Sequence, residues 1–322
     1  MSGDDRGPQQ PQLPTVEAPR GSRIRGSFLA VMFALNTLFW AVPVYLCILL
    51  KVLVPTHGRL FQRFSRWVAD LAQLWASCNT WFVDRFLPIR WDIQIDSEVR
   101  RDGQYLVCAN HQSWNDIVVL MKAFGRDTPF FKFFLKQELI WVPVLGPVWW
   151  GLDYPFMKRY SNEQIKRNPK LKGTDLETTR RACERAKHQP MLLLNFLEGT
   201  RFTKAKHDRQ ASPYQHLLKP KSGGFAFATS ALGERLNSLL DVTIVYPEGA
   251  KGLWDFLCGR VGSIIVRARK LQVPHRLYTG DYDSDHEFRK NFQKWVSTIW
   301  REKDEQISRL LAEAAAGPAP TR

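Results

Sequence analysis

The chain has 322 residues, 44% of them hydrophobic, which is enough for one large domain with a sizeable core and additional segments. Its formal net charge of +15 favours anionic partners. Twelve Trp and twenty Phe suit a membrane interface better than nucleic acid, for which no binding motif is present, so we expect no nucleic-acid partner. Five scattered Cys residues without a C-x-x-C pair predict neither a disulfide framework nor a metal site.

The N-terminal region contains a polar tail and a long apolar segment. Residues 1–26 are rich in Pro, Gln, Gly and charge, which predicts a disordered tail. From Phe28 to Leu50 the chain runs 23 residues without a charged side chain, enough to cross a bilayer core of ~30 Å. Basic residues flank both ends, so the positive-inside rule gives no orientation. A transmembrane span and a re-entrant segment bent at Asn36 or Pro43 therefore both stay open.

A second helix follows. Apolar residues recur at intervals of three and four between Phe61 and Phe86, which predicts an amphipathic helix. Such a helix can lie in a membrane interface or pack against a protein core. We expect residues 27–86 to form a hydrophobic membrane-anchoring helix pair. The protein is then expected in the cytoplasmic (inner) membrane, with its main domain facing the cytoplasm.

The main domain is expected at residues 87–311, followed by a disordered Ala/Pro tail at 312–322. Strand-like runs alternate with helical patterns there, which is typical of an α/β domain. We expect a mixed, largely buried sheet flanked by helices. The expected strands are 90–96, 104–109, 129–135, 191–197, 241–247 and 262–268; the expected helices are 116–124, 174–188, 222–236 and a last one from Phe288 to Trp300.

One stretch in this domain, Gln104 to Leu120, combines a buried strand, a polar turn and a helix start. His111 and Asp116 lie on either side of the turn. On a continuous helix, positions five apart would point about 140° away from each other, and a turn removes that obstacle. A His held by an Asp is the arrangement for general-base catalysis. A lone H-x-x-x-x-D pattern is weak evidence, however, because a His near a helix start often has only a structural role.

A second strand ends in a polar motif about 90 residues later. Met191 to Leu197 is a continuous apolar run, and it is followed by Glu198-Gly199-Thr200-Arg201. Gly permits a tight turn and close ligand approach, and Arg offers a planar fork suited to phosphate. A solvated basic loop is the alternative for this segment.

Taken together, the two motifs resemble the glycerolipid acyltransferase family, the 1-acylglycerol-3-phosphate acyltransferases and their relatives. Asn110, His111 and Asp116 match the family's N-H-x-x-x-x-D block, and Phe196 with 198–201 match its F-x-E-G-T-R block.

Two further family blocks have counterparts in this chain. Pro143 to Arg159 looks like the second block and Val242 to Pro247 like the fourth, in the family's order. The basic insert after the E-G-T-R motif resembles the lysocardiolipin-type branch and its bacterial relatives. Asp153-Tyr154, Tyr246 and Glu248 depart from simpler members, which leaves the acceptor open but not the reaction class.

The resemblance implies transfer of a fatty acyl group from an acyl thioester to the free hydroxyl of a lysophospholipid, 1-acylglycerol-3-phosphate first among them. His111 would be the base and Asp116 its orienting partner. The implied substrate-binding residues are Asn110, Arg159, Glu198, Gly199, Thr200 and Arg201. No cofactor is implied; acyl-CoA or acyl carrier protein would be the co-substrate, and membrane phospholipids the partners.

Several alternatives remain at this point. The enzyme could reacylate another lysophospholipid during membrane remodelling, or the chain could be a non-catalytic basic membrane-binding protein that kept the fold. Ser113 or Cys108 could serve as a covalent nucleophile, although the family pattern requires neither. The apolar stretch from Ile140 to Trp150 could line an acyl pocket or belong to the core.

Overall fold

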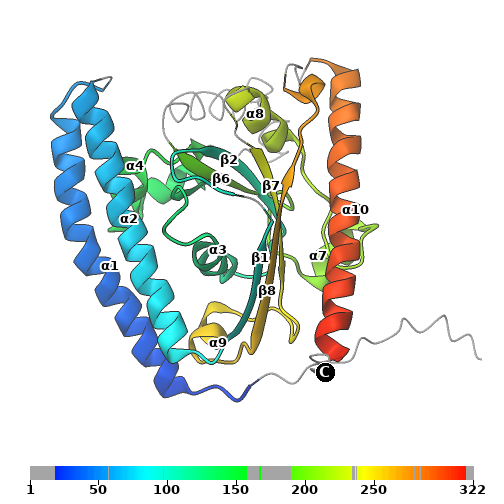
Figure 1. Cartoon of the computed structure of the whole chain (residues 1–322), viewed down its shortest axis with the longest axis horizontal. Helices are drawn as coiled ribbons and strands as arrows, with labels where there is room; N and C mark the ends of the chain where they lie inside the picture. Colours follow the sequence, from blue (N-terminus) through cyan, green and yellow to red (C-terminus); the bar gives the residue numbers. More distant parts are fainter. Residues whose placement is uncertain are drawn as a thin grey trace, which may run out of the picture.

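The computed structural model describes residues 19–56, 58–96, 98–157, 167, 190–233, 236, 238–278, 280, 282 and 284–316. An N-terminal helix pair lies beside an α/β domain (Figure 1). The helices are α1 (Arg23–Val52), α2 (Arg59–Phe86), α3 (Asp116–Phe124), α4 (Leu145–Gly151), α7 (Lys204–Gln210), α8 (Gly223–Leu232), α9 (Leu253–Leu257) and α10 (His286–Ala316), with 3-10 turns η1 (Gln137–Trp141) and η4 (His275–Leu277).

The domain is built on a six-stranded sheet with the order β1-β8-β7-β2-β6-β3. Its strands are β1 (Arg90–Ile95), β2 (Gln104–Ala109), β3 (Phe131–Phe133), β6 (Met191–Phe196), β7 (Ser238–Val245) and β8 (Ser263–Leu271). β7 and β8 are antiparallel and the other neighbours are parallel, so the expected mixed sheet is confirmed. Since β2, β6 and β7 run parallel, their carboxyl ends meet at one edge of the sheet.

Helices cover both faces of this sheet (Figure 1). One face packs against α8 and α10, with Phe225, Phe292 and Trp300 fully buried. The other face packs against α1, α2, α3 and α9, through residues such as Leu29 and Phe256. The middle strands are therefore enclosed on both sides, which explains their continuous apolar sequences.

The N-terminal helices pack against each other as a long pair. α1 runs as one helix through Asn36 and Pro43, so the helix is not interrupted at either residue. Asn36 instead points inward, where its amide donates to Asn79 Oδ1 (2.9 Å) and Trp75 O (3.1 Å) on α2. Within the described part of the chain, α1 is the one helix long and apolar enough to cross a membrane.

The ends of several elements differ from the expected ones. α1 begins at Arg23, inside the tail expected at 1–26, because Ser22 acts as its N-cap and accepts from Arg25 N. α10 continues to Ala316, inside the tail expected from 312, because its Ala-rich end favours helix. The expected strand 129–135 is divided into β3 and the short β4 (Leu135–Lys136), which pairs with β5 (Phe156–Met157). The expected helix 174–188 lies outside the described residues.

A buried ion pair fastens α10 to the middle of the sheet. Lys303 on α10 and Asp241 on β7 lie 2.6 Å apart, with exposed fractions of 0% and 1%. The Lys303 ammonium also donates to Val242 O (2.6 Å) and Thr243 Oγ1 (3.1 Å). Asp241 also accepts from Arg269 Nε (3.0 Å), so it keeps a cationic partner if Lys303 is removed, whereas removing Asp241 leaves the buried Lys303 ammonium without this carboxylate.

We therefore expect Asp241→Leu to lower the free energy of unfolding by about 3–5 kcal/mol, measured by denaturant titration of the detergent-solubilised protein. The double variant Lys303→Met/Asp241→Leu removes both charges and should recover much of that loss. Wild-type stability in the single variant would contradict this assignment of the pair.

Candidate active site

The turn between β2 and α3, residues 110–116, brings His111 and Asp116 together. We refer to it as the His–Asp turn. His111 Nδ1 lies 2.8 Å from Asp116 Oδ2. The same oxygen accepts from the backbone N–H groups of Gln112 (2.7 Å) and Ser113 (3.0 Å). These bonds fold the turn around the carboxylate of Asp116, the first residue of α3. The expected pairing of the imidazole with the carboxylate is therefore present.

The other oxygen of Asp116 is held by a residue that the sequence analysis did not assign to the site. Tyr246, just past the end of β7, donates its hydroxyl to Asp116 Oδ1 (2.7 Å). Burial, followed by the nearby Asp116 charge, raises the pKa of Tyr246 well above its ordinary value, so the phenol stays a donor. The departure from the family pattern at Tyr246 was the one signal that pointed to this contact.

The backbone and ring of His111 are fixed by the strand that precedes the E-G-T-R motif and by the motif's loop. Its N–H donates to Glu198 Oε1 (2.7 Å), and its carbonyl accepts from Phe202 N (2.7 Å). Its ring stacks on Phe196, with centroids 4.0 Å apart and planes at 14°. The side chain is 15% exposed and Nδ1 faces Asp116, so Nε2 is the ring nitrogen left for a ligand.

Glu198 lies in a different place from the expected substrate contact. It has no exposed surface, and its two oxygens accept from backbone N–H groups of His111 and Leu218 (3.0 Å). Burial raises the pKa of Glu198 to about 7, against the opposing effect of these two N–H donors. Glu198 therefore stabilises the His–Asp turn through its backbone and does not face a lipid substrate.

Asn110 also serves the framework. Its amide donates to Ile244 O and its side-chain oxygen accepts from Ile244 N, both at 2.8 Å. The side chain is fully buried, so it links the end of β2 to β7 and does not present itself to a substrate. Asn110 and Glu198 thus both stabilise the His–Asp turn, which contains His111.

The rest of the E-G-T-R motif lies at the surface. Gly199 has φ +67°, a conformation that favours glycine. Thr200 Oγ1 accepts from Lys206 Nζ (2.8 Å). Arg201 is exposed, and its guanidinium lies 4.6 Å from the ring centre of Trp114 in the His–Asp turn. An exposed guanidinium on an aromatic support can meet a phosphate. Arg159 lies outside the described residues.

Neither candidate nucleophile is accessible. Cys108 is fully buried in β2 with Sγ 3.4 Å from Asp241 Oδ1, and burial raises its pKa well above the ordinary value. Ser113 is buried and donates its hydroxyl to Lys251 O (2.6 Å). Among the described residues, no group of three or more His, Cys, Asp or Glu side chains could hold a metal ion.

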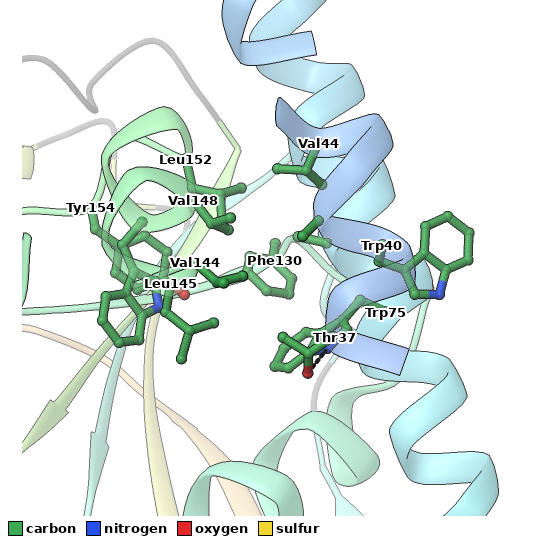
Figure 2. Close-up of a pocket in the computed structure, with 13 residues that line it drawn as sticks. Thr37, Trp40, Val44, Trp75, Phe130, Val144, Leu145, Val148, Leu152 and Tyr154 are labelled. Carbon is green, nitrogen blue, oxygen red and sulfur yellow. Dashed lines mark hydrogen bonds between the residues drawn. The ribbon is translucent and has the colours of Figure 1, made fainter. Parts of the chain in front are cut away.

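An apolar pocket separates the helix pair from the segment that contains α4 (Figure 2). Val144, Leu145 and Val148 line one side of it, so part of the stretch from Ile140 to Trp150 faces a cavity. Thr37, Trp40, Val44 and Trp75 line the side of the helix pair, and Phe130, Leu152 and Tyr154 belong to the domain.

The titration of Glu198 gives a test of this geometry. Burial raises the pKa of Glu198 to about 7 in the folded state, from 4.5 for an ordinary glutamate. The contribution of Glu198 to stability is therefore fully present below pH 4.5 and lost as pH rises through about 7. Glu198→Gln cannot titrate in this range. We expect the free energy of unfolding of the wild type, relative to Glu198→Gln, to decrease between pH 4.5 and about 7. A pH-independent difference would contradict the burial of this carboxylate.

Comparison with known proteins agrees with this architecture. The family model described as Acyltransferase matches residues 90–248. The 1-acyl-sn-glycerol-3-phosphate acyltransferase epsilon of Mus musculus is 25% identical over 295 residues, which cover 85% of this chain and 73% of that protein. The gamma enzyme of Mus musculus is 31% identical over 183 residues, which cover 54% of this chain and 44% of that protein.

A solved structure shares the fold. The crystal structure of the 1-acyl-sn-glycerophosphate (LPA) acyltransferase PlsC from Thermotoga maritima superposes with a TM-score of 0.53 at 16% identity, covering 91% of this chain and 99% of that chain. Assignment to the bacterial lysocardiolipin-type branch stays a prediction. The family model and the named relatives together support the assignment of this chain to the glycerolipid acyltransferase family, and thus to the acyltransferases.

Proposed function

We propose that this enzyme transfers a fatty acyl group from an acyl thioester to the free hydroxyl of 1-acylglycerol-3-phosphate, giving phosphatidate. The observation that carries the proposal is the buried Asp116 that holds His111 Nδ1 while Nε2 remains for a substrate. The named relatives that act on 1-acyl-sn-glycerol-3-phosphate support this acceptor.

In the proposed reaction, His111 Nε2 takes the proton of the acceptor hydroxyl as its oxygen attacks the thioester carbonyl. Asp116 keeps Nδ1 protonated and stabilises the imidazolium that forms. The carbon–sulfur bond then breaks, and the proton on Nε2 passes to the thiolate leaving group. An acyl ester and a free thiol result, and no acyl-enzyme is needed. General-base catalysis of this kind typically supplies about 10²–10⁴-fold.

Arg201 is the proposed partner of the acceptor phosphate, together with Arg159. The E-G-T-R loop is joined to the His–Asp turn by the hydrogen bond from Phe202 N to His111 O and by the stacking of Arg201 on Trp114. A phosphate on Arg201 would therefore be positioned relative to the base. Because the acceptor's hydroxyl and phosphate belong to one small headgroup, this link orients the reacting oxygen.

The helix pair and the adjacent pocket are the proposed binding region for the acyl chains of the substrates. α1 carries a stripe of exposed apolar residues, including Val31, Leu35, Leu38 and Val42, which is suited to lipid contact. We assign the helix pair to membrane anchoring, with the α/β domain on the cytoplasmic side. The apolar pocket between α1 and α4 would take an alkyl chain (Figure 2). The donor would be acyl-CoA or acyl carrier protein, with no cofactor.

A second acceptor is supported by one relative. The 2-acyl-1-lysophosphatidylinositol acyltransferase of Saccharomyces cerevisiae is 25% identical over 248 residues, which cover 66% of this chain and 62% of that protein. The same base would serve a larger headgroup. Purified protein, radiolabelled acyl-CoA and a panel of lysophospholipids distinguish the two acceptors.

The base is tested by two substitutions. His111→Ala should abolish transfer, because no other described group replaces the imidazole. Asp116→Asn should lower the rate by orders of magnitude, since an amide at this site favours the wrong tautomer of His111. The measurement is phosphatidate formation by protein shown to be folded by its thermal unfolding curve. Near-normal turnover in a folded His111→Ala variant would rule out this mechanism.

The phosphate contact is tested by Arg201→Lys, which keeps the charge but not the planar fork. A bidentate contact predicts a loss of about 1.5–3 kcal/mol, or roughly 10- to 150-fold in kcat/KM for the acceptor, with the KM for the thioester unchanged.

Exposed cations of the adjacent helix α7 provide the matched control. Lys204→Gln and Arg209→Gln remove charge nearby, so their effect should shrink as salt rises, because exposed charges are screened over about 8–10 Å. The Arg201→Lys defect should persist in high salt. Wild-type kinetics for Arg201→Lys on the acceptor, or a defect confined to the thioester, would exclude this role.

A further inference from the structure

The short helix α9 exposes two large apolar side chains next to the start of α1. Leu253 is 44% exposed and Trp254 is 46% exposed. The Trp254 ring lies close to Gly26 of α1, since a Cβ built on that glycine would stand 3.4 Å from it. A hydrogen bond from Ser22 N to Cys258 O (2.8 Å) fixes α9 against the beginning of α1. The exposed side chains of α9 therefore lie beside the first turns of α1, where Ile24 and Phe28 are also exposed.

Exposed large apolar side chains are unevenly distributed over the described part of the molecule. They lie on α1 and the residue after it, α2, the His–Asp turn, η1, α4 and α9. The opposite side of the sheet, covered by α8 and α10, carries none among the described residues. A soluble surface has scattered apolar residues, whereas a one-sided concentration marks an interaction surface.

The charges around α9 indicate what this surface binds. Arg23 is exposed beside Ile24, and Arg25 and Lys251 are half-buried nearby. Asp255, the acidic residue of α9, is paired with Arg260. An indole ring beside basic side chains that have no ion pair with another described residue suits the boundary of a bilayer with anionic lipids, where Trp lies at headgroup level and Lys and Arg reach phosphates.

The segment leading into α9 is also fastened to the His–Asp turn. Lys251 O accepts from Ser113 Oγ (2.6 Å) and from Asn115 Nδ2 (3.0 Å). Both donors are buried, and Asn115 directly precedes Asp116. A contact that fixes the position of α9 therefore also fixes the His–Asp turn, which contains the base His111.

We propose that Leu253 and Trp254 form a second contact with the bilayer, separate from the helix pair, that fixes the His–Asp turn at the surface of an anionic phospholipid membrane. This inference rests on the proposed use of a lipid acceptor. The helix pair supplies anchoring, and α9 sets the height of the active site above the headgroups. An acceptor hydroxyl then reaches His111 without leaving the membrane.

The direct test places a fluorophore on α9 of the full chain. Trp254→Cys carries an environment-sensitive dye in a background with Cys47, Cys78 and Cys183 replaced by Ser. The matched control is Asn291→Cys on the exposed side of α10. In vesicles of phosphatidylcholine and phosphatidylglycerol, the dye at 254 should shift to the blue and be quenched by lipids with nitroxide-labelled chains, while the dye at 291 should do neither. A dye at 254 as water-exposed as the one at 291 would overturn the proposal.

A kinetic test replaces the two exposed side chains of α9, in variants whose thermal unfolding curves match the wild type. Leu253→Glu/Trp254→Glu should lower turnover of a long-chain acceptor in vesicles about tenfold, and spare a short-chain acceptor dispersed as monomers. Asn291→Glu/Ala312→Glu adds the same charge on α10 and should change neither rate. Equal loss on both acceptors would overturn the proposal, because it would show a structural role for α9. The labelling needs no turnover, so a shielded dye in a protein that acylates no lysophospholipid would refute the proposed function alone and support this contact.

Discussion

A carboxylate without exposed surface sits at the centre of this molecule, and the surrounding structure depends on satisfying it. Asp116 accepts from the imidazole of His111, two backbone N–H groups of its own turn and the hydroxyl of Tyr246. A buried charge is tolerated only with such a complete set of donors. The cost of burying it fixes the path of the turn, the position of the end of β7 and the orientation of His111. A rigid, correctly oriented base follows from that constraint.

Much of the fold can be predicted from the sequence, because the patterns that define its strands and turns are local. The continuous apolar runs of β2 and β6 predict buried strands, and the polar residues between Ala109 and Asp116 predict the turn. The pairing of His111 with Asp116 follows from that turn. The ends of α1 and α10 differ from the predicted ones, because by composition alone Ser22 and the Ala-rich end of α10 resemble parts of disordered tails.

Long-range partners could not be read in the same way. The sequence indicates that Glu198 and Asn110 belong to the site, but not that their side chains point into the framework, since they bond backbone groups of segments distant in the chain. Tyr246 reaches Asp116 across 130 positions of the chain, and the buried pair of Lys303 and Asp241 joins segments that no periodicity connects. Such contacts arise from strand order, which a single sequence does not display.

The central claim is that His111 acts on the acceptor hydroxyl directly, with no protein nucleophile. Rapid-quench analysis of the wild-type enzyme mixed with radiolabelled acyl-CoA tests this most directly, in the absence and presence of lysophosphatidate. The account predicts no labelled protein without acceptor, and labelled phosphatidate in a single phase once acceptor is present. Labelled protein that forms without acceptor and then passes its acyl group to lysophosphatidate would contradict it.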